Sequence, residues 1–96
     1  MRLVWTDTAK KHLREILSYI RADDPAAARK MKVRIEKSVS YLAHQPFMGR
    51  QGALPGTRET IPHPSYRLVY QVLVDEVQIV ALVHTARQWP PMTDDD

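Results

Sequence analysis

The stretch Ser65–His84, "SYRLVYQVLVDEVQIVALVH", decides the fold. It holds two runs rich in Val, Ile, Leu and Tyr, which are typical of β-strands. Asp75 and Glu76 separate the runs and predict a two-residue hairpin turn, although this pair lacks the glycine that such turns favour. The stretch therefore predicts an antiparallel pair of strands, the two strongest strands of the chain.

Two amphipathic helices are expected ahead of this pair. Apolar residues recur at helical spacing and predict a helix from Thr8 to about Arg21, with Thr6 or Asp7 as its N-cap. The first stripe consists of Ala9, Leu13, Ile16, Leu17 and Ile20. A second stripe predicts a helix over about residues 25–43, with Asp24 as its cap and a proline at its first position. Such a helical hairpin needs a sheet to bury its apolar face.

Two shorter strands and a loop complete the order of elements. "MRLVW" at residues 1–5 and "TRETI" at 57–61 alternate as strands do, and the Pro and Gly content of residues 44–56 predicts a loop. The order is β-α-α-β-β-β. We expect an α+β fold in which the helical hairpin packs on one face of a small, mainly antiparallel sheet. Residues 1–91 form a single domain, and 92–96 form a short acidic tail.

Composition limits the classes of function. With 96 residues and no cysteine, the chain predicts one domain without disulfide or thiolate chemistry. The start lacks a long apolar run, which argues against a signal peptide and a membrane span and makes a cytoplasmic location the simplest expectation. No His, Asp and Glu set has metal-ligand spacing, and phosphate-binding glycine loops are absent, so we expect neither a metal nor a cofactor.

The charge is divided unevenly along the chain. Residues 1–50 carry a net charge of +6, and residues 51–96 carry −3. The first half is therefore suited to an acidic partner or a nucleic acid, and the alternative is that the two helices simply present solvated basic faces.

Counting outward from the predicted turn assigns the faces of the sheet. If Val74 pairs with Val77, Arg67 lies opposite His84 on the face away from the helices. The core face is then formed by Leu68, Tyr70, Val72, Val77, Ile79, Ala81 and Val83. Because the other face is mixed in polarity, it is expected to be at least partly open to solvent.

This geometry predicts a cluster of three arginines. Arg58 joins Arg67 from the preceding strand, and Arg87 lies just beyond the end of the last strand. Clustered arginines bind phosphates or carboxylates through paired hydrogen bonds. The alternative is that each arginine forms an ion pair with a local acid such as Glu59.

The chain resembles the RelE/ParE superfamily of bacterial toxins from type II toxin–antitoxin modules. The resemblance rests on the order and spacing of "VW", the alanine-rich segment after "DDP", "LAHQPFMGR", "GTRE", "YRLVYQV" and "HTARQWP". It implies the same fold as derived above and a growth inhibitor neutralised by a cognate antitoxin. It also implies that operator DNA is contacted only through the antitoxin, with no membrane partner.

The superfamily has two kinds of target, the ribosome with its mRNA and DNA gyrase. For a RelE-like mRNA interferase, the resemblance implies a metal-independent endoribonuclease site. Its catalytic residues would be Arg58, Arg67, His84 and Arg87, with His63 as the alternative to His84. Arginines stabilise the phosphorane charge, and histidine supplies a base or an acid. Here Thr60 replaces the second basic residue of the pattern, and Thr93 stands where RelE-like members have a tyrosine.

For a ParE-like gyrase inhibitor, the target-binding residues would be Arg67, Arg87 and Trp89. Trp89 either closes the edge of the core or anchors a partner, as buried tryptophans do at interfaces. "HTAR" and the missing tyrosine favour gyrase inhibition, while "YRLVYQV" occurs in RelE-like proteins as well. The mRNA interferase remains the alternative, and an inactive antitoxin-binding subunit is the third.

Overall fold

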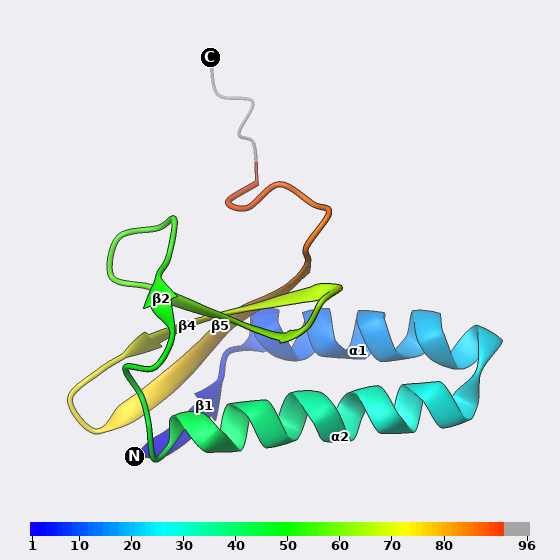
Figure 1. Cartoon of the computed structure of the whole chain (residues 1–96), viewed down its shortest axis with the longest axis horizontal. Coiled ribbons are helices and arrows are strands. Elements are labelled where there is room, and N and C mark those ends of the chain that lie inside the picture. The colour runs from blue at the N-terminus through cyan, green and yellow to red at the C-terminus, as the bar shows by residue number, and fades with distance from the viewer. Residues whose placement is uncertain (92–96) are drawn as a thin grey trace.

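The computed structural model describes residues 1–91 as two helices packed against one face of a five-stranded sheet (Figure 1). The elements are β1 (Arg2–Trp5), α1 (Asp7–Asp23), α2 (Pro25–Leu42), β2 (Arg50–Gln51), β3 (Arg58–His63), β4 (Tyr66–Val72) and β5 (Glu76–His84). This confirms the predicted α+β class and helical hairpin. The acidic tail expected at 92–96, which includes Thr93, lies outside the described residues.

The strands lie in the order β1-β5-β4-β3-β2, and all neighbours are antiparallel except β1, which runs parallel to β5. The two-residue strand β2 was not predicted, because the Pro and Gly content of residues 44–56 predicted a loop there. Strand β3 runs through Pro62 to His63, two residues beyond the predicted end, with an irregular register after Thr60.

Local capping explains where the helices begin. The Thr6 hydroxyl accepts a hydrogen bond from the N–H of Ala9 at 3.1 Å. The Asp24 carboxylate accepts one from the N–H of Ala27 at 3.1 Å, and Pro25 occupies the first position of α2. These contacts satisfy N–H groups that have no partner within the helix. Asp24 therefore caps α2, as the sequence predicted, and it also ends α1, which runs two residues beyond the end expected at about Arg21.

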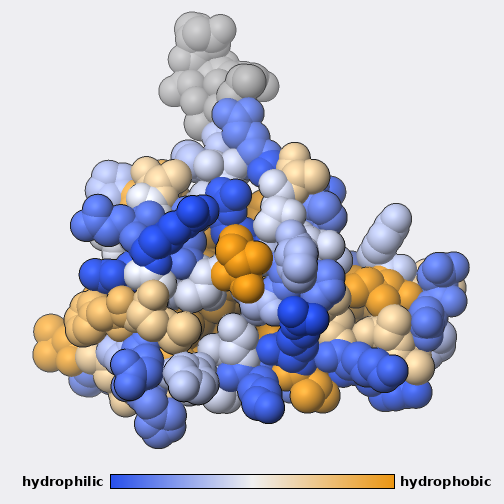
Figure 2. Space-filling model, in the orientation of Figure 1, coloured by the Kyte–Doolittle hydropathy of each residue, from blue (hydrophilic) through white to orange (hydrophobic). Residues whose placement is uncertain are grey.

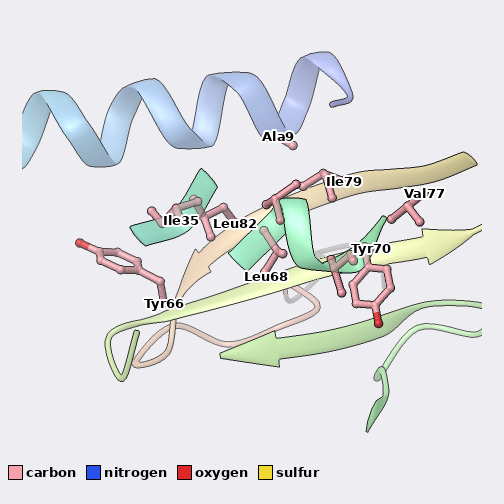
Figure 3. Close-up of a cluster of buried hydrophobic side chains, with 10 residues drawn as sticks. Ala9, Ile35, Tyr66, Leu68, Tyr70, Val77, Ile79 and Leu82 are labelled. Carbon is pink, nitrogen blue, oxygen red and sulfur yellow. The ribbon is translucent and has the colours of Figure 1, made fainter. Parts of the chain in front are cut away.

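The core fills the space between the helices and the sheet (Figure 3). Its buried members are Ala9, Ile35, Val39, Leu42, Tyr66, Leu68, Tyr70, Val77, Ile79 and Leu82. Leu3 and Trp5 of β1 pack against this cluster. The apolar stripes of both helices thus meet one face of the sheet.

The predicted register of the central hairpin is wrong. The turn is not centred on Asp75 and Glu76: β4 ends at Val72, which pairs with Val77, and the N–H of Leu73 donates to the carbonyl of Glu76 at 2.8 Å, so Val74 and Asp75 lie at the tip. Without glycine, the Asp-Glu pair does not form the tight turn. A second irregularity adds Val80 to β5, because Tyr70 pairs with Ile79 whereas Val69 pairs with Ala81.

The added residue exchanges the faces of the end of β5. Leu82 now points to the helices and joins the core, where Ala81 and Val83 had been expected. His84 follows Leu82 to the helix side, because alternate strand residues share a face. A bulge of this kind re-aims every side chain that follows it.

Candidate functional site

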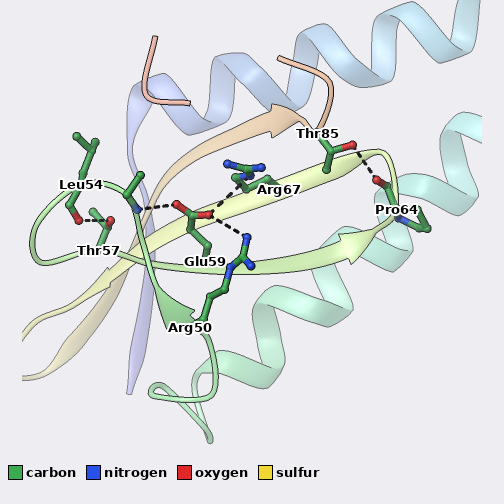
Figure 4. A network of polar contacts seen from close by, with 8 residues as sticks. Arg50, Leu54, Thr57, Glu59, Pro64, Arg67 and Thr85 are labelled. Carbon is green, nitrogen blue, oxygen red and sulfur yellow. Dashed lines mark hydrogen bonds and ion pairs between the residues drawn. The ribbon is translucent and has the colours of Figure 1, made fainter. Parts of the chain in front are cut away.

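Arg67 lies on the sheet face opposite the helices, where it meets a buried acid (Figure 4). Its Nε lies 3.7 Å from Oε1 of Glu59, whose residue is only 4% exposed. Arg50 approaches the same oxygen at 3.9 Å, and the N–H of Ala53 donates to Oε2 at 3.0 Å. The alternative interpretation of the arginines therefore applies to Arg67, which has a local acidic partner.

Arg58 points to the opposite face of the sheet. It pairs with Tyr70, a core residue on the helix side, whereas its neighbour Glu59 pairs with Val69 on the other side. The Nη1 atom of Arg58 donates to the carbonyls of Phe47 at 3.3 Å and Gly49 at 2.8 Å. The predicted cluster of Arg58 with Arg67 is therefore wrong, since the strand places them on different faces.

His84 does not lie beside Arg67, and that prediction is also wrong. The bulge at Val80 pairs His84 with Tyr66, and the two rings meet edge to face with centroids 5.5 Å apart. Its Nδ1 accepts a hydrogen bond from the N–H of Ala86 at 3.0 Å. His84 thus holds the backbone turn that follows β5.

Two further histidines bind the backbone in the same manner. The Nδ1 of His63 accepts from the N–H of Ser65 at 3.0 Å, in the turn between β3 and β4. The Nδ1 of His12 accepts from the N–H of Leu82 at 3.2 Å. Since β1 pairs with β5 only up to Ile79, His12 supplies an acceptor at an edge that β1 no longer covers.

Arg87 and Trp89 lie on the segment after β5, which rises on the side of the sheet away from the helices (Figure 1). Thr85 fixes the start of this segment through its hydroxyl, which donates to the carbonyl of Pro64 at 2.8 Å (Figure 4). Arg87 is exposed, whereas Trp89 is half-buried. The indole nitrogen of Trp89 is buried and has no hydrogen-bond partner within residues 1–91. The segment therefore presents an exposed cation, Arg87, which forms no ion pair with an acid of residues 1–91, close in sequence to the partly covered ring of Trp89.

A row of polar side chains crosses β1, β5 and β4 on this same face, which the sequence predicted to be mixed in polarity. Arg2 donates to Glu76 at 2.6 Å, Gln78 donates to the other oxygen of Glu76 at 3.0 Å, and Gln71 donates to Gln78 at 3.4 Å. The hydrogen bond from Arg2, followed by that from Gln78, lowers the pKa of Glu76. The only sequence signal for this row is the polar residue at alternate strand positions.

Tyr70 ties the loop after α2 to the sheet. Its hydroxyl donates to the carbonyl of Pro46 at 2.8 Å and accepts from the N–H of Gly49 at 2.9 Å. Burial raises the pKa of Tyr70. A Cβ at Gly49 would lie 2.6 Å from that hydroxyl, so the approach requires glycine. This tie places Phe47 beneath Arg58, whose guanidinium carbon lies 5.1 Å from the ring centroid.

Within residues 1–91, no three side chains of His, Asp or Glu come together as ligands for an ion. None of the helices that the structure describes is both long and apolar enough to cross a membrane.

Comparison with known proteins places the whole arrangement in a family. Protein Y4kP of Sinorhizobium fredii is 39% identical over 90 residues, which are 93% of each chain. Toxin RelE2 of Caulobacter vibrioides is 36% identical over 86 residues, covering 90% of this chain and 97% of that one. A solved structure of the chromosomal ParDE system of P. aeruginosa superposes with a TM-score of 0.77 at 26% identity, covering 88% of this chain and 95% of that one.

The family model described as the ParE toxin of the type II toxin–antitoxin system parDE matches residues 3–89. That range includes β1 apart from Arg2, both helices, all later strands and the segment that carries Arg87 and Trp89. The chain belongs to the ParE toxin family of type II toxin–antitoxin systems, within the RelE/ParE superfamily.

Proposed function

We propose that this toxin inhibits DNA gyrase by binding a protein surface, rather than by cutting mRNA on the ribosome. The observation that carries the proposal is the separation of the residues that a nuclease would need together. Arg58 lies on the helix side of the sheet, and Arg67 lies on the other side with Glu59. Metal-free RNA cleavage needs cations and a proton-transfer group around a single phosphate.

The position of His84 supports the same proposal. Its Nδ1 is bonded to the N–H of Ala86, and its ring edge rests on Tyr66. A general base must reach the proton that it removes, at about 3 Å or through one water. His84 would have to leave both of these contacts to meet a phosphate held by Arg67.

The surface proposed to bind the target is formed by Arg87, Trp89 and the exposed part of Arg67. Arg87 is exposed at the exit of β5, and 21% of the Arg67 side chain is accessible. Trp89 offers the exposed part of a large ring, whose buried N–H has no partner within the described chain. Tryptophan and arginine are the residues that most often dominate the energy of protein interfaces.

The proposed regulating partner is a cognate antitoxin with an acidic segment. The first half of the chain, with its two helices, carries a net charge of +6, which favours an acidic partner. Operator DNA would then be reached through the antitoxin. Binding of purified toxin to the protein encoded beside it, measured with its dependence on salt, tests this part.

Two assays on purified protein test the target. Supercoiling by gyrase and cleavage of mRNA on translating ribosomes are measured with the same toxin preparation. We expect inhibition of supercoiling and intact mRNA. Cleavage of ribosomal mRNA with unaffected supercoiling would contradict gyrase inhibition and support the mRNA interferase. Activity in neither assay would support the inactive antitoxin-binding subunit.

A further inference from the structure

A pocket of about 320 Å³ lies beside Arg58, at the end of the sheet that the helices leave uncovered. Its lining includes Phe47, Gln51, Leu54, Pro55, Arg58 and Val72. Most of these side chains are apolar, and Arg58 is the single charged group among them. The pocket therefore combines one fixed cation with a wall of mixed polarity, whose apolar part is formed by Phe47, Leu54, Pro55 and Val72, on the face opposite the target-binding surface proposed above.

The Arg58 guanidinium is held in place before any ligand arrives. Two carbonyls accept from its Nη1, and the Phe47 ring lies against it with 5.1 Å between guanidinium carbon and ring centroid. Within residues 1–91 the hydrogen bonds of Arg58 use Nη1 alone, which leaves the donors on Nε and Nη2 for another acceptor. Pre-oriented donors bind an anion with less loss of side-chain entropy.

The charge of Arg58 is not neutralised by an acid of the described chain. The ion pairs of residues 1–91 join Arg2 to Glu76, and Arg50 and Arg67 to Glu59. Glu59 is adjacent in sequence to Arg58 but points to the opposite face, where Arg67 meets it. Strand β3 thus places Glu59 on the face where Arg67 meets it, and it leaves Arg58 on the opposite face without an acidic partner among residues 1–91.

The far wall of the pocket is a rigid loop. The N–H of Gly52 donates to the carbonyl of Thr57 at 2.8 Å, and the N–H and hydroxyl of Thr57 donate to the carbonyl of Leu54 at 3.1 and 2.6 Å. Gly56 has a φ of +80°, which suits glycine and closes the turn. Closed in this way, the loop holds the wall residue Leu54 at a fixed position facing Arg58.

We propose that this pocket binds a carboxylate side chain flanked by an apolar residue, on a peptide segment of a protein partner. Arginine matches a carboxylate through paired N–H groups, and the apolar part of the wall suits the neighbouring side chain. A nucleic acid fits less well, because phosphate binding draws on several basic residues along a groove and this pocket offers one. Apolar surface also gathers at this end of the molecule (Figure 2), where Phe47 is 63% exposed.

Matched peptides test the proposal without reference to gyrase or to any antitoxin. The acetylated and amidated tripeptide Leu-Glu-Leu is titrated into labelled full-length toxin, and backbone amide shifts of residues 52–58 are followed by NMR. Leu-Gln-Leu is the control peptide, and inorganic phosphate and a short single-stranded oligonucleotide are separate probes. We expect saturable shifts with Leu-Glu-Leu and at least about tenfold weaker binding of Leu-Gln-Leu, since the charged hydrogen bond is lost.

Variants assign the effect to Arg58. Arg58→Gln should weaken Leu-Glu-Leu binding by at least about tenfold, whereas Arg50→Gln, which removes an exposed arginine on the other face, should not. Equal binding of the two peptides to wild type, no binding of Leu-Glu-Leu at millimolar concentration, or binding of phosphate or oligonucleotide instead would each overturn the proposal. If Arg58→Gln fails to fold, the peptide pair on wild type still decides.

Discussion

Glu59 and Arg67 face one another across adjacent strands, with Oε1 and Nε 3.7 Å apart on the side of the sheet away from the helices. The carboxylate also accepts the N–H of Ala53 and lies near Arg50. One buried acid therefore holds together β3, β4 and the loop after β2. The pair is part of the scaffold that carries the surface, and this relationship leads to the first prediction.

Glu59→Ala is expected to lower the free energy of unfolding by about 2 to 4 kcal/mol, because it leaves the partly buried Arg67 without its counter-ion and the N–H of Ala53 without its acceptor. Urea denaturation of the two proteins measures the loss. Arg50→Ala is the matched control, since Arg50 is exposed, and it should change stability by less than about 1 kcal/mol. Similar stability of Glu59→Ala and wild type would remove Glu59 from this role.

A second prediction concerns the uncovered edge of β5. His12→Ala deprives the N–H of Leu82 of its acceptor, and an unsatisfied buried donor costs about 1 to 3 kcal/mol. Thermal or urea unfolding measures the change. His12→Asn retains an acceptor oxygen near the position of Nδ1 and should restore part of the stability. Equal losses for both variants would indicate that packing of the imidazole, and not the hydrogen bond, matters at this position.

Much of the fold could be predicted from local sequence patterns, but the register of the hairpin formed by β4 and β5 could not. The stripe from Ala9 to Ile20 and the cap at Asp24 depend on neighbours within a few residues, so the helices were predicted to within two residues at their ends. Alternation along β5 depends on an uninterrupted strand. The insertion of Val80 breaks it, and the bond from Leu82 to His12 that supports the new arrangement joins residues 70 positions apart.

The positions of the candidate site residues were also hard to predict, because they depend on strand pairing between distant parts of the chain. Arg67 was placed correctly on the face away from the helices, but Arg58 was assigned to the same face without a pairing that fixes β3, and its pairing with Tyr70 puts it on the helix side. Glu59 was recognised as a candidate partner, but its contacts with Arg50 and the N–H of Ala53 come from the short strand β2 and the loop after it, which have no periodicity to detect. Arg87 and Trp89 were placed correctly at the exit of β5, since their position follows directly from the end of that strand.

A third prediction uses the lowered pKa of Glu76. Because the hydrogen bonds from Arg2 and Gln78 favour its charged form in the folded protein, Glu76 contributes stability that is present above its ordinary pKa of 4.5. That contribution is lost as the pH falls through the lower folded value. Melting temperatures of wild type and Glu76→Gln, measured between pH 6 and pH 2, should therefore differ most at the upper end and converge in acid. A constant difference across the range would contradict the linkage.

The last prediction separates the two targets through Arg87 and Trp89. A gyrase inhibitor concentrates its binding energy in a few anchors, so Trp89→Ala should cost about 2 kcal/mol or more of affinity for gyrase, comparable to Arg87→Ala. In a nuclease, by contrast, Arg87→Ala would lower the cleavage rate by about a hundredfold or more, while Trp89 would matter less.

Affinity for gyrase and ribosomal cleavage are measured for each variant. The control is Arg21→Ala, which replaces an exposed arginine in the last turn of α1. Since Trp89 is half-buried, each variant is first compared with wild type by thermal unfolding, and affinity is calculated per folded molecule. Full affinity of folded Trp89→Ala for gyrase would exclude the indole ring as an anchor and leave Arg87 to account for binding at the exit of β5.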